Sequence, residues 1–200
     1  MFDVLVLDAM GVIYSSKDDV EELLIPFIRA RGGASAKTIE HCYQSASMGD
    51  LSAEDFWYRV GLSPEVEDEY LESFTLTPGL MEFLDRMVKS EIPVMALTND
   101  VSRWSTKLRK KFGLEKSIRH WVVSGDVCVR KPDPLIYDAL IKNSEKGEEG
   151  IYLFVDDRIK NLDTAYQKGW KTVLFRPERD AETEHHATAC DFQELWKLIR

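Results

Sequence analysis

The stretch Val4-Leu-Val-Leu-Asp-Ala-Met-Gly11 decides the fold, because an apolar run leads directly into an aspartate and a glycine. The run does not alternate between apolar and polar residues, which is typical of a strand covered on both faces. Four later runs have the same character, at residues 94–97, 121–123, 151–155 and 172–175. Helix-patterned segments, bounded by turn signals, separate these later runs at about 102–112, 132–143 and 158–168. Strands that alternate with helices predict a parallel sheet with helical crossovers.

The region at 16–77 interrupts this alternation, since its patterns predict amphipathic helices and no convincing strand. Ser52, followed three residues later by Asp55, marks one helix start. We therefore expect an α/β core, residues 1–15 and 78–200, interrupted after its first strand by a helical insertion at 16–77. The helices expected in and just after the insertion lie at about 18–31, 35–47, 52–60, 64–74 and 79–90.

The composition excludes several classes of protein. The 200 residues carry 26 basic and 35 acidic side chains, a net charge of −9, which argues against a nucleic-acid partner. No apolar run reaches the roughly 18 residues of a membrane span, and the first residues lack the features of a signal peptide. The three cysteines, Cys42, Cys128 and Cys190, lie far apart in the sequence and favour neither disulfides nor a zinc site. We therefore expect a cytoplasmic protein without a membrane partner.

Polar residues follow the apolar runs at the points where the predicted strands end. Because ligands of open parallel sheets bind beyond the carboxyl ends of the strands, these residues are candidates for one site. They are Asp8, Thr98 with Asn99, Lys131 after a loop, and the pair Asp156-Asp157.

Each of these residues has an ordinary structural explanation when taken alone. Thr98 and Asn99 could cap a helix, the acidic pair could favour the next helix dipole, and Lys131 could be a solvated charge. Together they are harder to explain, because crowded acids repel one another unless a cation is present. A bound Mg²⁺ and Lys131 would supply that charge.

Such a site permits acyl-phosphate chemistry, in which a strand-end carboxylate attacks phosphorus. The metal and the lysine then offset the charge of the phosphoryl oxygens, while a hydroxyl and backbone N–H groups orient them. Gly11 would let the backbone approach the phosphate closely.

These residues, in this order, resemble the motifs of the haloacid dehalogenase superfamily of hydrolases over essentially the whole chain. The insertion resembles the helical cap of the subgroup whose cap lies between the first two motifs, and residues 48–57 are similar to a common stretch of such caps. The resemblance implies a Rossmann-like parallel sheet with helices on both faces and an inserted α-helical cap. The four motifs correspond to Asp8-Ala-Met-Gly-Val12, Thr98, Lys131-Pro132, and Asp156-Asp157 with Asn161.

The resemblance also implies roles for single residues and a small phosphorylated metabolite as substrate. Asp8 would be the nucleophile and an Mg²⁺ ligand, and the residue at Met10 would bind the metal through its backbone carbonyl. Asp157 would be the other protein ligand, with Asp156 acting through water or orienting the lysine. Thr98, Asn99, Gly11 and Lys131 would hold the phosphoryl group.

Met10 departs from the family pattern, because the family has a second aspartate there that protonates the leaving group and later activates water. A thioether has no proton to give. The loss of a positioned acid typically slows a reaction 10²- to 10⁴-fold, roughly 3 to 5 kcal/mol of barrier. Ordinary alkyl-phosphate hydrolysis is therefore in question.

Three hypotheses follow. The chain could be an active phosphatase or phosphotransferase that obtains its proton elsewhere, and the cap offers four donors: His41, Asp50, Glu54 and Asp55. It could instead be a weak or inactive relative that binds phosphate and Mg²⁺. It could act at carbon, as dehalogenases do, although these tend to lose the acidic pair. A phosphonate hydrolase would need a cap lysine, and only Lys17 and Lys37 are present. We expect His185 and His186, in a polar stretch, to be surface residues.

Overall fold

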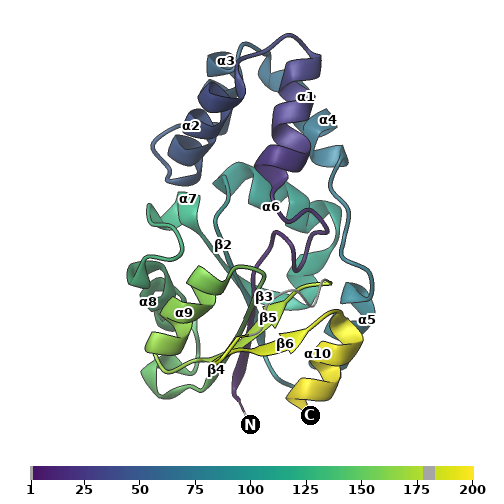
Figure 1. Ribbon diagram of the computed structural model, residues 1–200, viewed down its shortest axis with the longest axis vertical. Helices are drawn as coiled ribbons and strands as arrows, with labels where there is room; N and C mark the ends of the chain where they lie inside the picture. Colours follow the sequence, from purple (N-terminus) through teal and green to yellow (C-terminus); the bar gives the residue numbers. More distant parts are fainter. Residues whose placement is uncertain (1, 178–182) are drawn as a thin grey trace.

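The computed structural model describes residues 2–177 and 183–200 and is built around one parallel sheet (Figure 1). Its strands lie in the order β3-β2-β1-β4-β5-β6, so β1 lies in the interior of the sheet. Each pair of neighbours is parallel; Leu7, for example, is in register with Ala96 and with Val155. The strands are β1 (Val4–Leu7), β2 (Val94–Thr98), β3 (Ile118–Val123), β4 (Tyr152–Asp156), β5 (Lys171–Phe175) and β6 (Ala187–Ala189).

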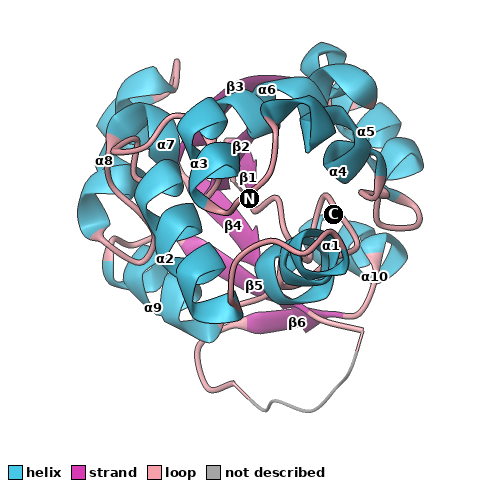
Figure 2. Ribbon diagram, turned by 90° about the horizontal axis from the view of Figure 1, so that it is seen from above, coloured by secondary structure: helices cyan, strands magenta, loops and turns pink. Residues whose placement is uncertain are grey.

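Both faces of the sheet are covered, which explains why β1 is apolar at every position. Leu5 and Leu7 pack into one core cluster with α5 (Leu80–Lys89) and α10 (Phe192–Ile199). Val4 and Val6 pack on the opposite face with α8 (Pro134–Asn143) and α9 (Ile159–Gln167). Figure 2 shows the two helix pairs on opposite sides of the strands. Burial of apolar side chains on both faces is the main term that stabilises this layered fold.

The helices between β1 and α5, which we call the inserted helices, lie above the carboxyl edge of the sheet (Figure 1). Ser35 and Ser52 cap two of them, accepting hydrogen bonds from the backbone N–H groups of Thr38 and Asp55. The first begins with a π-helical turn, and the last is 3-10 helical before it becomes α-helical. The segments are η1 (Val20–Leu24), α1 (Ile25–Ala30), α2 (Ala36–Ser47), α3 (Ala53–Arg59), η2 (Pro64–Val66) and α4 (Glu67–Glu72).

Glu67 ties the inserted helices to the core. Its Oε2 accepts hydrogen bonds from Trp57 Nε1 at 3.2 Å and from Trp104 Nε1 at 2.9 Å, and Trp104 lies on α6 (Ser102–Lys111). Its Oε1 lies 2.8 Å from Arg103 Nε and 2.7 Å from Lys107 Nζ, also on α6. A buried carboxylate is stable only when it is paired in this way. The remaining short elements are η3 (Leu114–Lys116), α7 (Ser124–Val127) and η4 (Gly147–Glu149).

The edge strand β6 was not expected, and it changes the interpretation of one histidine. His186 is buried next to this strand, and its ring nitrogens lie 2.7 Å from Thr172 Oγ1 and 3.1 Å from Asp163 Oδ1. The expectation that His186 is a surface residue is therefore wrong, because β6 packs it against β5 and α9. His185 is half exposed and stacks on Tyr166. Within the described ranges, no helix has the length and apolarity needed to cross a membrane.

Candidate active site

The carboxyl ends of three neighbouring strands bring the candidate residues together. Asp8 directly follows β1, Thr98 ends β2 and Asp156 ends β4. Lys131 enters from the loop between α7 and α8. All four side chains are buried, as expected for residues that a central parallel sheet places at its edge.

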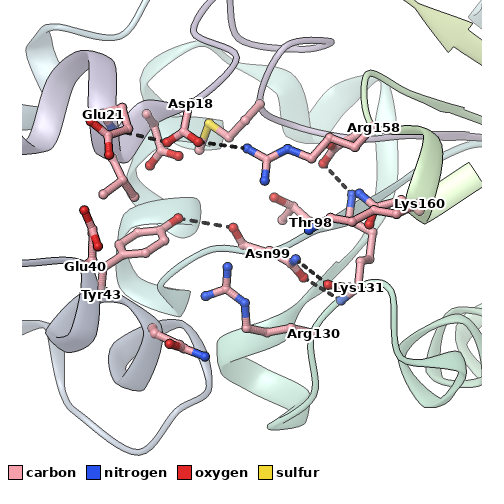
Figure 3. A pocket seen from close by; sticks show the side chains of 16 residues that line it. Asp18, Glu21, Glu40, Tyr43, Thr98, Asn99, Arg130, Lys131, Arg158 and Lys160 are labelled. Atoms are coloured by element: carbon pink, nitrogen blue, oxygen red, sulfur yellow. Dashed lines mark hydrogen bonds and ion pairs between the residues drawn. The ribbon is translucent and has the colours of Figure 1, made fainter. Parts of the chain in front are cut away.

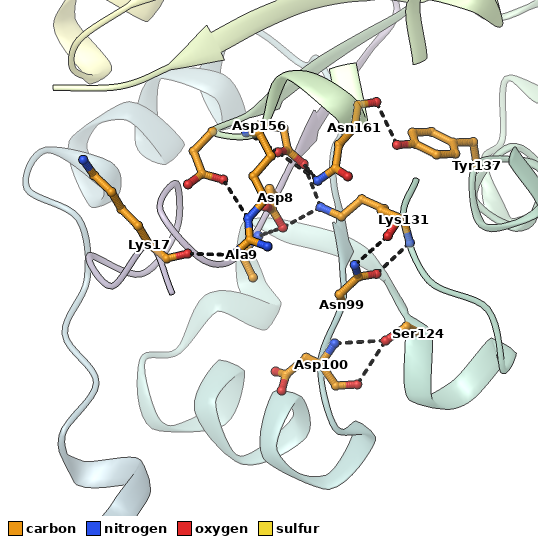
Figure 4. Close-up of polar contacts among 12 residues, drawn as sticks. Asp8, Ala9, Lys17, Asn99, Asp100, Ser124, Lys131, Tyr137, Asp156 and Asn161 are labelled. Carbon is orange, nitrogen blue, oxygen red and sulfur yellow. Dashed lines mark hydrogen bonds and ion pairs between the residues drawn. The ribbon is translucent and has the colours of Figure 1, made fainter. Parts of the chain in front are cut away.

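Lys131 bridges two carboxylates at the centre of the site (Figure 4). Its Nζ lies 2.6 Å from Asp8 Oδ1 and 2.8 Å from Asp156 Oδ2, and the lysine side chain is 1% exposed. Burial lowers the pKa of Lys131, but the charges of Asp156 and Asp8 outweigh it and raise that pKa above its ordinary value. Lys131 is therefore a fixed positive charge.

Burial, and then repulsion by Asp156, raises the pKa of Asp8 well above its usual range, while Lys131 opposes the shift. The site therefore needs more positive charge than Lys131 alone provides if Asp8 is to be ionised and nucleophilic at neutral pH.

Asp156 is fully engaged by the protein. Asn161 Nδ2 donates to both of its oxygens, at 3.1 and 3.0 Å, and the backbone N–H of Arg158 donates to Oδ1 at 2.8 Å. With Lys131 on Oδ2, this carboxylate is held in one orientation. Its contacts favour an orienting role toward the lysine, one of the two roles that the resemblance implied.

Asn99 acts on the loop that carries Lys131. Its Oδ1 accepts from the backbone N–H of Lys131 at 2.8 Å, and its Nδ2 donates to the carbonyl of Lys131 at 3.0 Å. The side-chain amide thus fixes the backbone of Lys131, while Asn99 also lines the cavity that opens over the site.

Oδ1 of Asn161 has no hydrogen-bond partner among the described residues, and the same holds for two further buried atoms of the site, Oγ1 of Thr98 and Oδ1 of Asp157. Nε of Arg158 lies 4.0 Å from Asp157 Oδ1, beyond hydrogen-bond distance. Burial raises the pKa of Asp157 to about 6, and Asp156 adds to the shift. Buried polar atoms are nearly always paired, so these atoms indicate that a ligand completes the site.

The acidic residues fit a hard cation. Ligand oxygens of Asp8, Asp156 and Asp157 all lie within 4.8 Å of one another, and Mg²⁺ prefers carboxylate and carbonyl oxygens. The oxygen of Asp157 that has no hydrogen-bond partner among the described residues best supports a cation held by these carboxylates. A cation here would also relieve the mutual repulsion of the three carboxyl groups.

Gly11 is required for a reason the sequence did not show. Its φ is +77°, and a Cβ atom on it would lie 2.8 Å from Cγ and Oδ2 of Asp157. A side chain here would collide with that carboxyl group. The absence of a side chain at Gly11 thus lets the backbone lie close to the Asp157 carboxyl group, in addition to any approach to phosphate.

A cavity of about 450 Å³ opens over these residues (Figure 3). Met10 lines it and is buried, so the position of the absent acid faces the same space as Asp8. The lining carries charges of both signs. The basic side chains come from the core and are Arg130, Lys131, Arg158 and Lys160. The acidic side chains come from the start of the inserted region and from α2, and are Asp18, Asp19, Glu21 and Glu40.

The proton donors expected from the sequence are not at this cavity. Its lining, among the residues that the structure describes, includes none of His41, Asp50, Glu54 and Asp55, nor Lys17 or Lys37. It does include Asp19, which is 5% exposed and which sequence reasoning missed. The available signal was the acidic pair Asp18-Asp19 at the point where the insertion begins.

Comparison with known proteins agrees with the fold. The family model of haloacid dehalogenase-like hydrolases matches residues 2–167. No curated protein sequence matches the chain.

Among solved structures, a HAD phosphatase from Thermococcus onnurineus is 18% identical with a TM-score of 0.75, covering 98% of this chain and 97% of its own. L-2-haloacid dehalogenase from Xanthobacter autotrophicus is 18% identical with a TM-score of 0.69, covering 100% and 99%. A HAD family enzyme from Bacteroides thetaiotaomicron, solved with magnesium and inorganic phosphate, is 16% identical with a TM-score of 0.71, covering 92% and 98%.

Proposed function

The chain belongs to the haloacid dehalogenase-like hydrolase family, and we propose that within it the protein is a Mg²⁺-dependent phosphatase or phosphotransferase. Asp8 is the nucleophile, and the reaction passes through an aspartyl-phosphate. The substrate is a small phosphorylated metabolite, for which the cavity of about 450 Å³ has room.

One observation carries this proposal: Lys131 Nζ lies between the carboxylates of Asp8 and Asp156, and Thr98 and Asp157 each have a buried oxygen without a hydrogen-bond partner among the described residues. A nucleophile, a fixed cation, a free hydroxyl and a free carboxylate oxygen are the groups that phosphoryl transfer needs. The structural relative from Bacteroides thetaiotaomicron, which was solved with magnesium and inorganic phosphate, supports the same substrate class.

Asp8, Asp157 and the backbone carbonyl of Met10 would hold Mg²⁺, with Asp156 acting on Lys131 or through water. When bound, Mg²⁺ offsets the negative charge of the phosphoryl oxygens and favours the ionised form of Asp8. Lys131 and the hydroxyl of Thr98 orient the same oxygens. Asp8 then attacks phosphorus, the bond to the leaving oxygen breaks, and water or an acceptor hydroxyl later releases the phosphoryl group.

The inserted helices carry part of the cavity lining, since Tyr43 and Gln44 of α2 face it. We assign residues 16–77 the role of a cap that selects the substrate and limits water at the site. Because Met10 cannot protonate a leaving group, acyl and aryl phosphates, which need little protonation, are the substrates expected to react fastest.

The acidic pair favours this function over the two alternatives. Chemistry at carbon needs no metal, so it would leave Asp157 and its unpartnered oxygen without a role. A relative that only binds phosphate would keep the same contacts, and it is distinguished by turnover alone. The L-2-haloacid dehalogenases among the structural relatives make a haloacid panel the appropriate second assay.

The test is phosphate release from acetyl phosphate and p-nitrophenyl phosphate, in Mg²⁺ and in EDTA, with Asp8→Asn in parallel. We expect turnover that requires Mg²⁺ and disappears in Asp8→Asn. If wild type does not exceed the variant, the protein is a binding relative or acts at carbon, and release of halide from 2-haloacids separates these two outcomes.

A further inference from the structure

The cavity lacks a proton donor at Met10 but contains four other acidic side chains. Three of them are committed elsewhere or solvated. Asp18 Oδ2 lies 3.3 Å from Arg158 Nη2 and its Oδ1 accepts from the backbone N–H of Glu21, while Glu21 and Glu40 are exposed. Asp19 is the exception among the acids that line the cavity.

Asp19 combines burial with contact to the cavity. It is 5% exposed, it lines the same space as Asp8, and its Oδ2 has no hydrogen-bond partner within the described part of the chain. It directly precedes η1, at the point where the chain enters the inserted helices. A buried, unpaired carboxyl oxygen at a ligand cavity is a group that a ligand would complete.

The surroundings of Asp19 favour its protonated form. Burial raises its pKa to about 7, the neighbouring charge of Asp18 adds to the shift, and Tyr43 and Arg158 only partly oppose it. A general acid works best when its pKa lies near the working pH. The titratable and charged groups that face Asp19 are Asp18 on its own segment, Tyr43 on α2, Tyr70 on α4, Asp100 after β2 and Arg158 after β4.

We propose that Asp19 is the general acid of this enzyme and replaces the donor that Met10 cannot provide. This proposal rests on the proposed phosphotransfer at Asp8. It extends the substrate class from acyl and aryl phosphates to esters with poor leaving groups, such as alkyl phosphates.

The proton balance is complete. As the Asp8 carboxylate forms its bond to phosphorus, the bond from phosphorus to the ester oxygen breaks, and the Asp19 carboxyl gives its proton to that oxygen. The alcohol leaves, and Asp19 is now a carboxylate. In the second step Asp19 takes a proton from the attacking water, the hydroxyl oxygen bonds to phosphorus, and Asp8 is released as a carboxylate.

Asp100 shows why burial alone is insufficient. It is also buried, with Oδ2 unpartnered among the described residues and a pKa raised well above the usual range, chiefly by desolvation. However, Asp100 does not line the cavity, so it cannot reach a leaving group there. Contact with the cavity therefore selects Asp19 over Asp100.

The test compares kcat/KM for glycerol phosphate, a poor leaving group, with kcat/KM for acetyl phosphate, in wild type, Asp19→Asn and Glu40→Gln. Asp19→Asn is expected to lower the value for glycerol phosphate by about 10²- to 10⁴-fold and the value for acetyl phosphate by less than about tenfold. Glu40→Gln removes an exposed acid of the same cavity and is expected to change both values by the same factor. The fall of wild-type kcat/KM for glycerol phosphate above about pH 7 should disappear in Asp19→Asn.

If Asp19→Asn leaves the ratio of the two kcat/KM values unchanged, the proposal for Asp19 is overturned, while the proposed role of Asp8 as nucleophile stands. Absence of Mg²⁺-dependent turnover of acetyl phosphate by wild type would overturn both this proposal and the proposed function. If Asp19→Asn does not fold, Asp19→Ala removes the same proton with less bulk, and the same ratio of the two substrates decides.

Discussion

Nζ of Lys131 lies 2.6 Å from Oδ1 of Asp8, and the two groups form a buried ion pair at the edge of the sheet. Oδ2 of Asp156 contacts the same nitrogen, so the lysine is the common partner of two carboxylates. Without this lysine both carboxyl groups would lose their cationic partner, and an unpaired buried charge is costly. The stability and the proposed chemistry of the site therefore depend on the same cation.

Lys131→Met tests this dependence on stability. Removing the cation leaves two buried carboxyl groups uncompensated, so we expect a loss of about 3 to 5 kcal/mol in the free energy of unfolding. Lys160→Met is the control, because that lysine lines the same cavity but is exposed, and it should change stability by less than about 0.5 kcal/mol. Urea unfolding at pH 7.5 measures both variants. Equal effects would show that the central ion pair adds nothing to folding.

Gly11→Ala tests the contact between the first loop and Asp157. The variant combines a left-handed φ of +77° with a Cβ atom 2.8 Å from the Asp157 carboxyl group, so both stability and Mg²⁺ affinity should fall. Gly32→Ala has a nearly identical φ of +74° and nothing within 4 Å. That control should cost only the backbone strain, about 1 to 2 kcal/mol.

Isothermal titration with Mg²⁺ separates the two glycine variants. Gly32→Ala should bind the metal as wild type does, whereas Gly11→Ala should bind at least tenfold more weakly. A Gly11→Ala protein with unchanged Mg²⁺ affinity would contradict the placement of Asp157 in the metal site.

Glu67→Leu tests the link between the inserted helices and α6. The variant removes the acceptor of two tryptophan N–H groups and the partner of two cations, and a loss of roughly 3 to 5 kcal/mol is expected. Glu69→Leu is the matched control, since its pair with Arg31 is largely exposed and should contribute about 1 kcal/mol or less. Thermal unfolding of the two variants gives the comparison, and similar melting temperatures would contradict the assigned role of Glu67.

The pH dependence of stability should depend on Asp19. Its pKa is about 7 in the folded protein against an ordinary value of 3.8, so the unfolded chain loses this proton first. The folded state therefore binds more protons between those values, and stability from this group is full below about pH 4 and lost as pH rises toward 7. One such group contributes a slope of about 1.4 kcal/mol per pH unit. Denaturant unfolding from pH 4.5 to 7 should thus show a flatter profile for Asp19→Asn, and identical profiles would refute the shift.

Much of the fold and the centre of the site could be predicted from local sequence. Asp8, Thr98 and Asp156 each follow an apolar run, and parallel strands necessarily bring their carboxyl ends to one edge. Lys131 was found through its motif, although only tertiary structure shows that it bridges two acids.

The residues that were missed depend on distant neighbours. Asp19 is an ordinary aspartate in sequence, and its burial near Tyr43 of α2 and Tyr70 of α4 is seen only in the folded chain. His186 is buried because the three-residue strand β6, too short and polar for a periodic signal, pairs with β5. The hydrogen bonds by which the Asn99 amide fixes the backbone of Lys131 could not be predicted either, because they reach a loop 32 residues away.

The most direct test of the account is to trap the phosphoryl group. Wild-type protein is mixed with acetyl phosphate and Mg²⁺, quenched in acid and digested at low pH, and the peptides are analysed by mass spectrometry. The account predicts one added phosphoryl group on the peptide that contains Asp8, removed by hydroxylamine and absent in EDTA and in Asp8→Asn. A phosphoryl group on any other residue, or turnover with no dependence on Asp8, would contradict it.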